Sequence, residues 1–118
     1  LVKLKKNMVE LDGEIIVLPM DNYVEGPWIY KRNGHYYNVY AAIGEGRETI
    51  SYAMAENIEG PWTNMGELSG MAEDSFTIHP GVIDYNGKSY LFYYYSTLSL
   101  DGCGPATGRR SVCVDEMF

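Results

Sequence analysis

The chain alternates apolar and polar positions over short runs, and each run is bounded by a turn signal. Alternation of this kind predicts strands, because successive side chains of a strand point to opposite faces of its sheet. The clearest pair of runs is residues 28–30 and 35–42, which are rich in aromatic residues and are joined by Asn33-Gly34. Asn-Gly fits the two positive φ angles of a tight hairpin turn. We therefore expect a hairpin here, with the Glu25 carboxylate held at its mouth.

Further strands are expected on either side of this hairpin. Before it, residues 7–11 and 14–18 flank Asp12-Gly13, and the second of these runs is nearly all apolar, as in a buried strand. After it, residues 49–55 alternate and predict a third strand, and residues 63–68 predict a weaker outer strand. A sustained helical period with capping residues is missing. The pattern therefore predicts an all-β fold.

The hairpin recurs farther along the chain. Asn86-Gly87 lies 53 positions after Asn33-Gly34, and the flanking proline and tyrosines match in the same register without a gap. A Gly-containing loop is expected over residues 96–108, followed by a strand over residues 109–115. A period near 50 residues with about four short strands per repeat is typical of a β-propeller blade.

This repeat divides the chain into three parts of one partial propeller domain. We expect residues 1–19 to be the tail of a preceding blade, residues 20–70 to be one blade, and residues 71–118 to be most of the next. A propeller normally needs roughly four to eight blades to close its ring. About two blades cannot close it, so we interpret the sequence as part of a longer chain.

Composition and charge exclude some functions. Hydrophobic residues make up 46% and charged residues 21% of the 118 residues, which is an ordinary globular balance. The net charge of −7 disfavours binding to nucleic-acid phosphates. No apolar run approaches the about 20 residues of a membrane helix, no signal peptide is evident, and the compartment is left open. Cys103 and Cys113 lack metal-site spacing and predict free thiols.

Three motifs in a fixed order carry a resemblance to a known family. They are the Glu25-Gly26-Pro27-Trp28 hairpin, the segment 75–81 with its His-Pro-Gly, and the Arg-Arg-Ser-Val run over residues 109–112. Together they resemble glycoside hydrolase family 43, whose members are five-bladed β-propellers and include β-xylosidases, α-L-arabinofuranosidases and arabinanases. The resemblance covers about residues 11–118. It implies a glycosidase that hydrolyses xylose- or arabinose-containing plant polysaccharides or oligosaccharides with inversion.

The resemblance implies roles for individual residues. Glu25 matches the general acid, and Arg110 matches an arginine that reaches the cleft, so Arg109, on the opposite face of the strand, is expected to point away. His79 matches a histidine near the propeller axis that holds water or a cation such as calcium; no other cofactor is implied. The family's catalytic base and the aspartate that tunes the acid have no motif match in these residues. These 118 residues alone are therefore expected to be inactive.

Each assignment has a simpler alternative. Glu59 lies in a second Glu-Gly-Pro-Trp tetrapeptide, but no aromatic hairpin follows it, so we expect a surface turn there. The context of Glu25, rather than the tetrapeptide, therefore supports its assignment. A lone histidine such as His79 more often has a structural role, and Trp28 either stacks on sugar at the cleft rim or packs in the core. The alternative function is a non-catalytic propeller that binds carbohydrate or protein.

Overall fold

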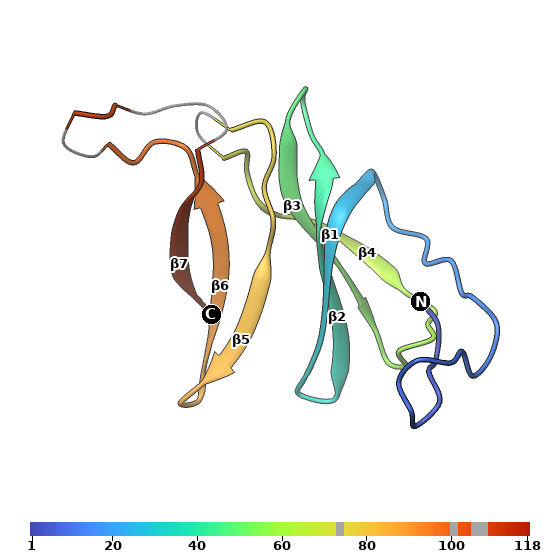
Figure 1. Cartoon of the computed structure of the whole chain (residues 1–118). Coiled ribbons are helices and arrows are strands. Elements are labelled where there is room, and N and C mark those ends of the chain that lie inside the picture. The colour runs from blue at the N-terminus through green and yellow to red at the C-terminus, as the bar shows by residue number, and fades with distance from the viewer. Residues whose placement is uncertain (73–74, 100–101, 105–108) are drawn as a thin grey trace.

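The computed structural model shows two antiparallel sheets lying side by side (Figure 1). It describes residues 1–72, 75–99, 102–104 and 109–118, and within these ranges the elements are all strands. Part of the loop expected over residues 96–108 lies outside the described residues. The expectation of an all-β fold without helices is confirmed for the described part.

The first sheet has four strands, each paired with its neighbour in sequence. The strands are β1 (Tyr23–Arg32), β2 (His35–Ile43), β3 (Glu48–Ala55) and β4 (Thr63–Ser69). The predicted hairpin is present, and its turn residues Asn33 and Gly34 have φ angles of 50° and 87°. Two positive φ angles in succession are what Asn-Gly tolerates at low cost, so the turn chemistry fixes the register of β1 and β2.

The second sheet repeats the arrangement with three strands. They are β5 (Gly81–Tyr85), β6 (Lys88–Tyr95) and β7 (Ser111–Met117). Arg32 pairs with His35 in the first hairpin, and Tyr85 pairs with Lys88, each 53 positions later, in the second. The sequence repeat is therefore a structural repeat. Strand β7 begins after the two arginines, which precede it instead of opening it.

Strand β1 differs from its repeat β5 at the end that carries Glu25. The pairing of β1 with β2 shifts register on both sides of Glu25, and Gly26 has a φ of 62°. Glu25 thus lies inside β1, at a bulge, because the strand begins at Tyr23 and not at residue 28 as expected. Bulges change the direction of a side chain and are frequent beside active sites.

The hairpin predicted around Asp12-Gly13 is wrong. The chain turns earlier, and Leu4 bridges to Leu11 across that turn. The Asn7 side chain accepts hydrogen bonds from two of the backbone N–H groups that follow it, which stabilises the earlier turn. Residues 14–18 form no strand and are largely exposed, because no neighbouring strand is available to them among the described residues. The assignment of residues 1–19 to a preceding blade stays a prediction.

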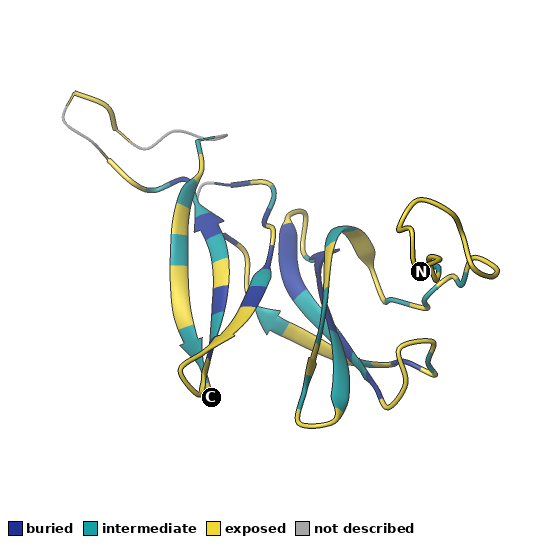
Figure 2. Ribbon diagram, turned by 60° about the horizontal axis from the view of Figure 1, so that its bottom comes forward, coloured by how far each residue is buried: buried dark blue, intermediate teal, exposed yellow. Residues whose placement is uncertain are grey.

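The core consists of two clusters on opposite faces of the first sheet. Figure 2 shows that buried residues occur along strands of both sheets. One cluster lies between the sheets and contains Val39, Ala41, Ile50, Ala72, Ile78, Val82 and Leu91. The other covers the far face of the first sheet and contains Tyr40, Ala42, Ala53, Ala55 and Trp62. Strands β2 and β3 are therefore buried on both faces, and the two sheets share one apolar boundary.

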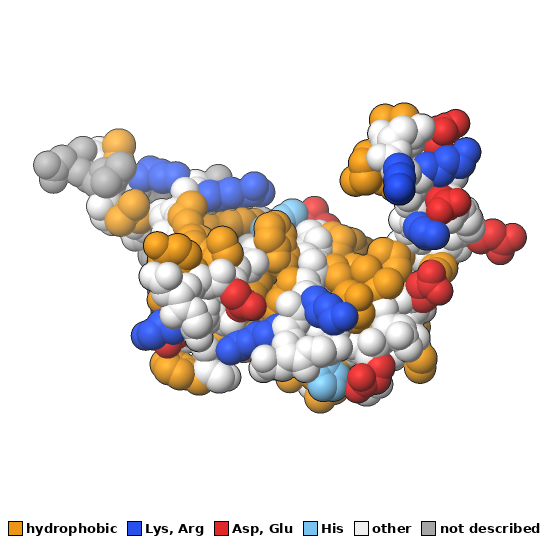
Figure 3. Space-filling view, turned by 90° about the horizontal axis from the view of Figure 1, so that it is seen from below, with side chains coloured by type: hydrophobic (Ala, Val, Ile, Leu, Met, Phe, Trp, Pro, Cys, Tyr) orange, Lys and Arg blue, Asp and Glu red, His pale blue; other side chains and the backbone are white. Residues whose placement is uncertain are grey.

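Apolar side chains are also exposed over both sheets (Figure 3). They include Val112 and Val114 on β7, and Ile15 and Val17 in the N-terminal segment. Strands of a propeller blade normally have such faces covered by the neighbouring blade. The exposed surface thus has the character of a blade boundary.

Candidate active site

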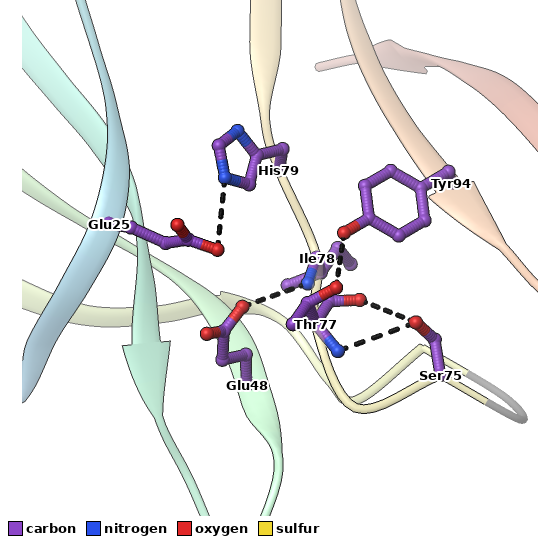
Figure 4. Close-up of polar contacts among 7 residues, drawn as sticks. All are labelled: Glu25, Glu48, Ser75, Thr77, Ile78, His79 and Tyr94. Atoms are coloured by element: carbon purple, nitrogen blue, oxygen red, sulfur yellow. Dashed lines mark hydrogen bonds and ion pairs between the residues drawn. The ribbon is translucent and has the colours of Figure 1, made fainter. Parts of the chain in front are cut away.

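Glu25 and His79 meet where the two sheets meet (Figure 4). Glu25 comes from the bulge of β1, and His79 comes from the segment that leads into β5. The Nε2 atom of His79 lies 3.1 Å from Oε1 of Glu25, and both side chains are 46% exposed. A carboxylate and an imidazole are the side chains that most often transfer protons in enzymes, and here they are in contact and open to solvent.

Gly26 allows this contact. Its φ of 62° lies in the left-handed region, which side chains rarely adopt. A Cβ atom placed on Gly26 would lie 2.9 Å from Nδ1 of the His79 ring. The glycine therefore serves two purposes, since it forms the bulge and leaves room for the imidazole against the backbone.

The segment before His79 is anchored to both sheets (Figure 4). The hydroxyl groups of Thr77 and Tyr94 share a hydrogen bond of 2.5 Å, which ties the segment to β6. The backbone N–H of Ile78 donates to Oε2 of Glu48, 3.0 Å away, which ties it to β3. The hydroxyl of Ser75 donates to the Thr77 carbonyl at 2.8 Å and closes the local turn. These bonds fix the position of the backbone that leads into His79.

Glu48 is a residue of this site that the sequence analysis missed. It is the first residue of β3, and only 8% of its surface is exposed. A signal was available, because Glu48 is in phase with Ile50 and Tyr52, which pack in the boundary between the sheets. A carboxylate in phase with core positions indicates a buried acceptor of hydrogen bonds.

Trp28 joins the sheets at a second point. Its indole N–H donates to the Val82 carbonyl at 2.9 Å, so β1 is bonded to β5. The side chain stays 45% exposed and lines an apolar cavity of about 300 Å³ with Gly81, Val82, Ile83 and Phe92. The bond to Val82 gives Trp28 a structural role at the boundary between the sheets. That Trp28 stacks on the sugar stays a prediction.

The two arginines make different contacts. The Arg110 guanidinium lies 4.8 Å from the centre of the Tyr94 ring, whose hydroxyl bonds to Thr77 near His79. The Arg109 carbonyl accepts a hydrogen bond from Ser96. Arg110 is thus linked by contacts to the segment that carries His79. That Arg110 reaches the sugar and Arg109 points away stays a prediction.

The described residues do not by themselves make a metal centre. No group of three or more His, Cys, Asp or Glu side chains in the described ranges is arranged to hold an ion. His79 has Glu25 as its polar partner, so any cation there would need water or residues from outside this part of the chain. Both cysteines are free, as expected.

Two tyrosines of the sheets have strongly raised pKa values. Burial raises the pKa of Tyr30 to about 12, and Tyr37, stacked with a ring separation of 5.1 Å, adds to the shift. The hydrogen bond from the Tyr93 hydroxyl to Asp115 raises the pKa of Tyr93. Both phenols therefore stay protonated well above neutral pH, and that of Tyr93 donates to Asp115.

Two characterised proteins are similar to this chain in sequence. A β-D-galactofuranosidase of Aspergillus niger is 30% identical over 122 residues, which cover 99% of this chain and 35% of that protein. A β-xylosidase of Xylanibacter ruminicola is 33% identical over 103 residues, 85% of this chain and 30% of that protein. No protein-family model matches the chain. The chain thus spans about a third of the length of these relatives.

Solved structures extend the similarity to the fold. A family 43 enzyme from Xanthomonas citri complexed with xylotriose superposes with a TM-score of 0.79 and 26% identity, over 98% of this chain and 37% of that one. An α-L-arabinofuranosidase from Clostridium thermocellum superposes with a TM-score of 0.77 over 99% of this chain and 40% of that one; at 23% identity it supports the fold alone. The resemblance to family 43 and to part of its propeller is confirmed. No helix that could span a membrane occurs in the described residues.

Proposed function

We propose that this chain, a segment of a glycoside hydrolase of family 43, supplies the general acid Glu25 to an enzyme that hydrolyses glycosidic bonds. The proposed substrates are xylose- or arabinose-containing plant polysaccharides or oligosaccharides, and the proposed outcome is inversion. The names of the two proteins similar in sequence support this function over a non-catalytic propeller, because they describe a galactofuranosidase and a xylosidase.

The observation that carries the proposal is the Glu25–His79 contact. Glycoside hydrolysis needs a carboxylic acid that protonates the leaving oxygen while the bond breaks. His79 contacts Oε1 of Glu25, so the second oxygen, Oε2, is the one proposed to carry the proton toward the sugar. With Nε2–H as the donor, the imidazole would fix the orientation of the carboxyl group without competing for that proton.

An inverting reaction needs a second carboxylate, which activates water from the opposite face of the sugar at roughly 6.5–9.5 Å from the acid. We assign this base, and the aspartate that tunes the acid, to the part of the protein that the similar enzymes have and this chain does not span. Arg110 and Trp28 are proposed to contact the sugar at the rim of the same cleft. His79 is proposed to hold a water molecule, or a calcium ion completed by ligands from elsewhere, beside Glu25.

The dependence on the leaving group tests the proposal. In the complete protein, Glu25→Ala should lower the hydrolysis of a natural xylo- or arabino-oligosaccharide by about 10²–10⁴-fold, because an alkoxide needs the proton. A nitrophenyl glycoside should lose far less, since nitrophenolate leaves without protonation. Equal losses on the two substrates, measured as kcat/KM, would show that Glu25 is not the general acid.

A further inference from the structure

We propose that Glu48 is a positioning residue, which holds His79 against Glu25 through the backbone of Ile78. The inference rests on the proposed function of Glu25. It adds a residue that makes no described contact with either member of the pair and that no comparison assigns. Figure 4 shows the relay, in which the Glu48 carboxylate contacts Ile78 and the next residue, His79, turns toward Glu25.

Glu48 connects to the segment through two hydrogen bonds. Its own N–H donates to the Phe76 carbonyl at 3.2 Å, and its Oε2 accepts from the Ile78 N–H at 3.0 Å. The two bonds reach Phe76 and Ile78, on either side of Thr77, so they fix both the position and the rotation of the segment. Strand β3 of the first sheet thereby holds the segment that enters the second sheet.

The hydrogen bond from Ile78 to Glu48 is important because its acceptor is buried. Glu48 is 8% exposed and the Ile78 side chain is fully buried in the boundary between the sheets. Among the described residues, Glu48 forms no ion pair with a lysine, arginine or histidine. Burial of a carboxylate costs free energy unless hydrogen-bond donors satisfy its oxygens. The Ile78 N–H is such a donor, so this bond offsets the cost of burying Glu48.

The consequence for the site follows from chain geometry. Ile78 and His79 are consecutive, so their Cα atoms stay about 3.8 Å apart. A shift of Ile78 is therefore passed to His79, which has little room because its ring lies against Gly26. Tyr94 fixes Thr77 from the second sheet. From the sheet that carries Glu25, core side chains pack on Ile78, and among the described residues Glu48 supplies the hydrogen bond to its backbone. Glu48 thus sets the distance between the acid and its partner.

Two conservative substitutions in the complete enzyme separate the effect of the length of the Glu48 side chain from the effect of its charge. Glu48→Gln keeps an oxygen at the same reach and loses the charge, whereas Glu48→Asp keeps the charge and withdraws the oxygen by one methylene. We expect kcat on an oligosaccharide to stay within about 3-fold of the parent for Gln and to fall by about 10–100-fold for Asp, since small displacements at a catalytic group have effects of this size. The reverse order would overturn the inference.

A double mutant distinguishes a residue that acts through His79 from one that only stabilises the fold. If Glu48 acts through His79, then Glu48→Asp should cause no further loss of kcat in a His79→Ala background. Additive losses would mean that Glu48 acts by another route, and the inference would be wrong. Glu67→Asp, an exposed carboxylate on β4 of the same sheet, is the matched control and should leave kcat unchanged.

The same set of proteins distinguishes this inference from the proposed function. If Glu25→Ala retains the parent activity, the assignment of the general acid fails, and the positioning role of Glu48 fails with it. If Glu25→Ala loses activity and Glu48→Asp does not, only the role of Glu48 fails. Thermal unfolding of each variant normalises kcat to folded protein, so a drop that merely follows the folded fraction also counts against the relay.

Discussion

Two copies of the tetrapeptide Glu-Gly-Pro-Trp lie at opposite edges of the first sheet and have different environments. In the first copy, Glu25 contacts His79 of the next sheet, and the Trp28 indole bonds to the Val82 carbonyl across the boundary. In the second copy, Glu59 is exposed in the turn before β4, and the Trp62 indole bonds to the Ile58 carbonyl of that turn. One copy thus joins two sheets, and the other closes a loop on itself.

The glycines show how the surroundings decide the outcome. Both have positive φ, 62° at Gly26 and 101° at Gly60. A Cβ on Gly26 would meet the His79 ring, whereas a Cβ on Gly60 would meet Trp62 of the same tetrapeptide. Identical residues therefore make a long-range contact in one place and a local contact in the other. The tetrapeptide is a turn element, and its partners determine whether it can take part in chemistry.

The largest expected difference is between the two glutamates. In the complete enzyme, Glu25→Ala should lower kcat/KM on an oligosaccharide by about 10²–10⁴-fold, as for loss of a positioned general acid. Glu59→Ala should stay near the parent value, because its carboxylate is exposed in a turn. Steady-state kinetics on the two variants makes the comparison, and a larger loss in Glu59→Ala would mean that the roles have been assigned to the wrong copies.

The tryptophans should differ in the opposite sense when stability is measured. Trp62 is 7% exposed and Trp28 is 45% exposed. Trp62→Ala should lower the free energy of unfolding by about 3–5 kcal/mol, as for large core aromatics. Trp28→Ala should lower it by less and should instead raise KM for the oligosaccharide. Urea unfolding checks the order, which is contradicted if Trp28→Ala is the more destabilised protein.

Substitution of the two glycines is expected to have a smaller effect than substitution of Glu25. Gly26→Ala should reduce kcat by about 10–100-fold, because the new Cβ displaces the imidazole from Glu25. Gly60→Ala also places a side chain at a positive φ and is the control, so it should lower the melting temperature without changing kcat per folded molecule. The prediction fails if both variants lose the same share of kcat.

The smallest expected effect comes from the indole N–H of Trp28. Trp28→Phe keeps an aromatic ring but replaces the indole by a smaller one without the N–H. Loss of the bond to Val82 should lower the free energy of unfolding by about 0.5–1.5 kcal/mol, and the smaller ring adds to that loss. KM should change little if the ring itself stacks on the sugar. Unfolding and kinetics measured on this one variant separate the structural contact from the sugar contact.

Local chemistry was sufficient to predict most of the strands. Asn33-Gly34 and Asn86-Gly87 determine their turns through positive φ, and alternation identifies β3 and β4. The N-terminal hairpin was mispredicted because two turn signals compete there. Asn7 accepts hydrogen bonds from the backbone that follows it, and this turn prevails over Asp12-Gly13.

The site was predictable only in part, for the same physical reason. Glu25 and His79 could be named as candidates because each lies in a recognisable local motif. Their contact, the role of Gly26 as a space for the imidazole, and the Glu48 acceptor all depend on how two sheets pack. Residues that act across a boundary between sheets carry no local signal except their phase in a strand, which for Glu48 matched the core positions.

The bond between Trp28 and Val82 also makes the boundary between the sheets optically visible. The 118 residues contain two tryptophans, one at this boundary and one in the core of the first sheet. The difference between the emission spectra of the parent and of Trp28→Phe isolates the fluorescence of the boundary indole. Quenching of that signal by acrylamide, with and without bound sugar, would then follow relative movement of the two sheets without an added dye.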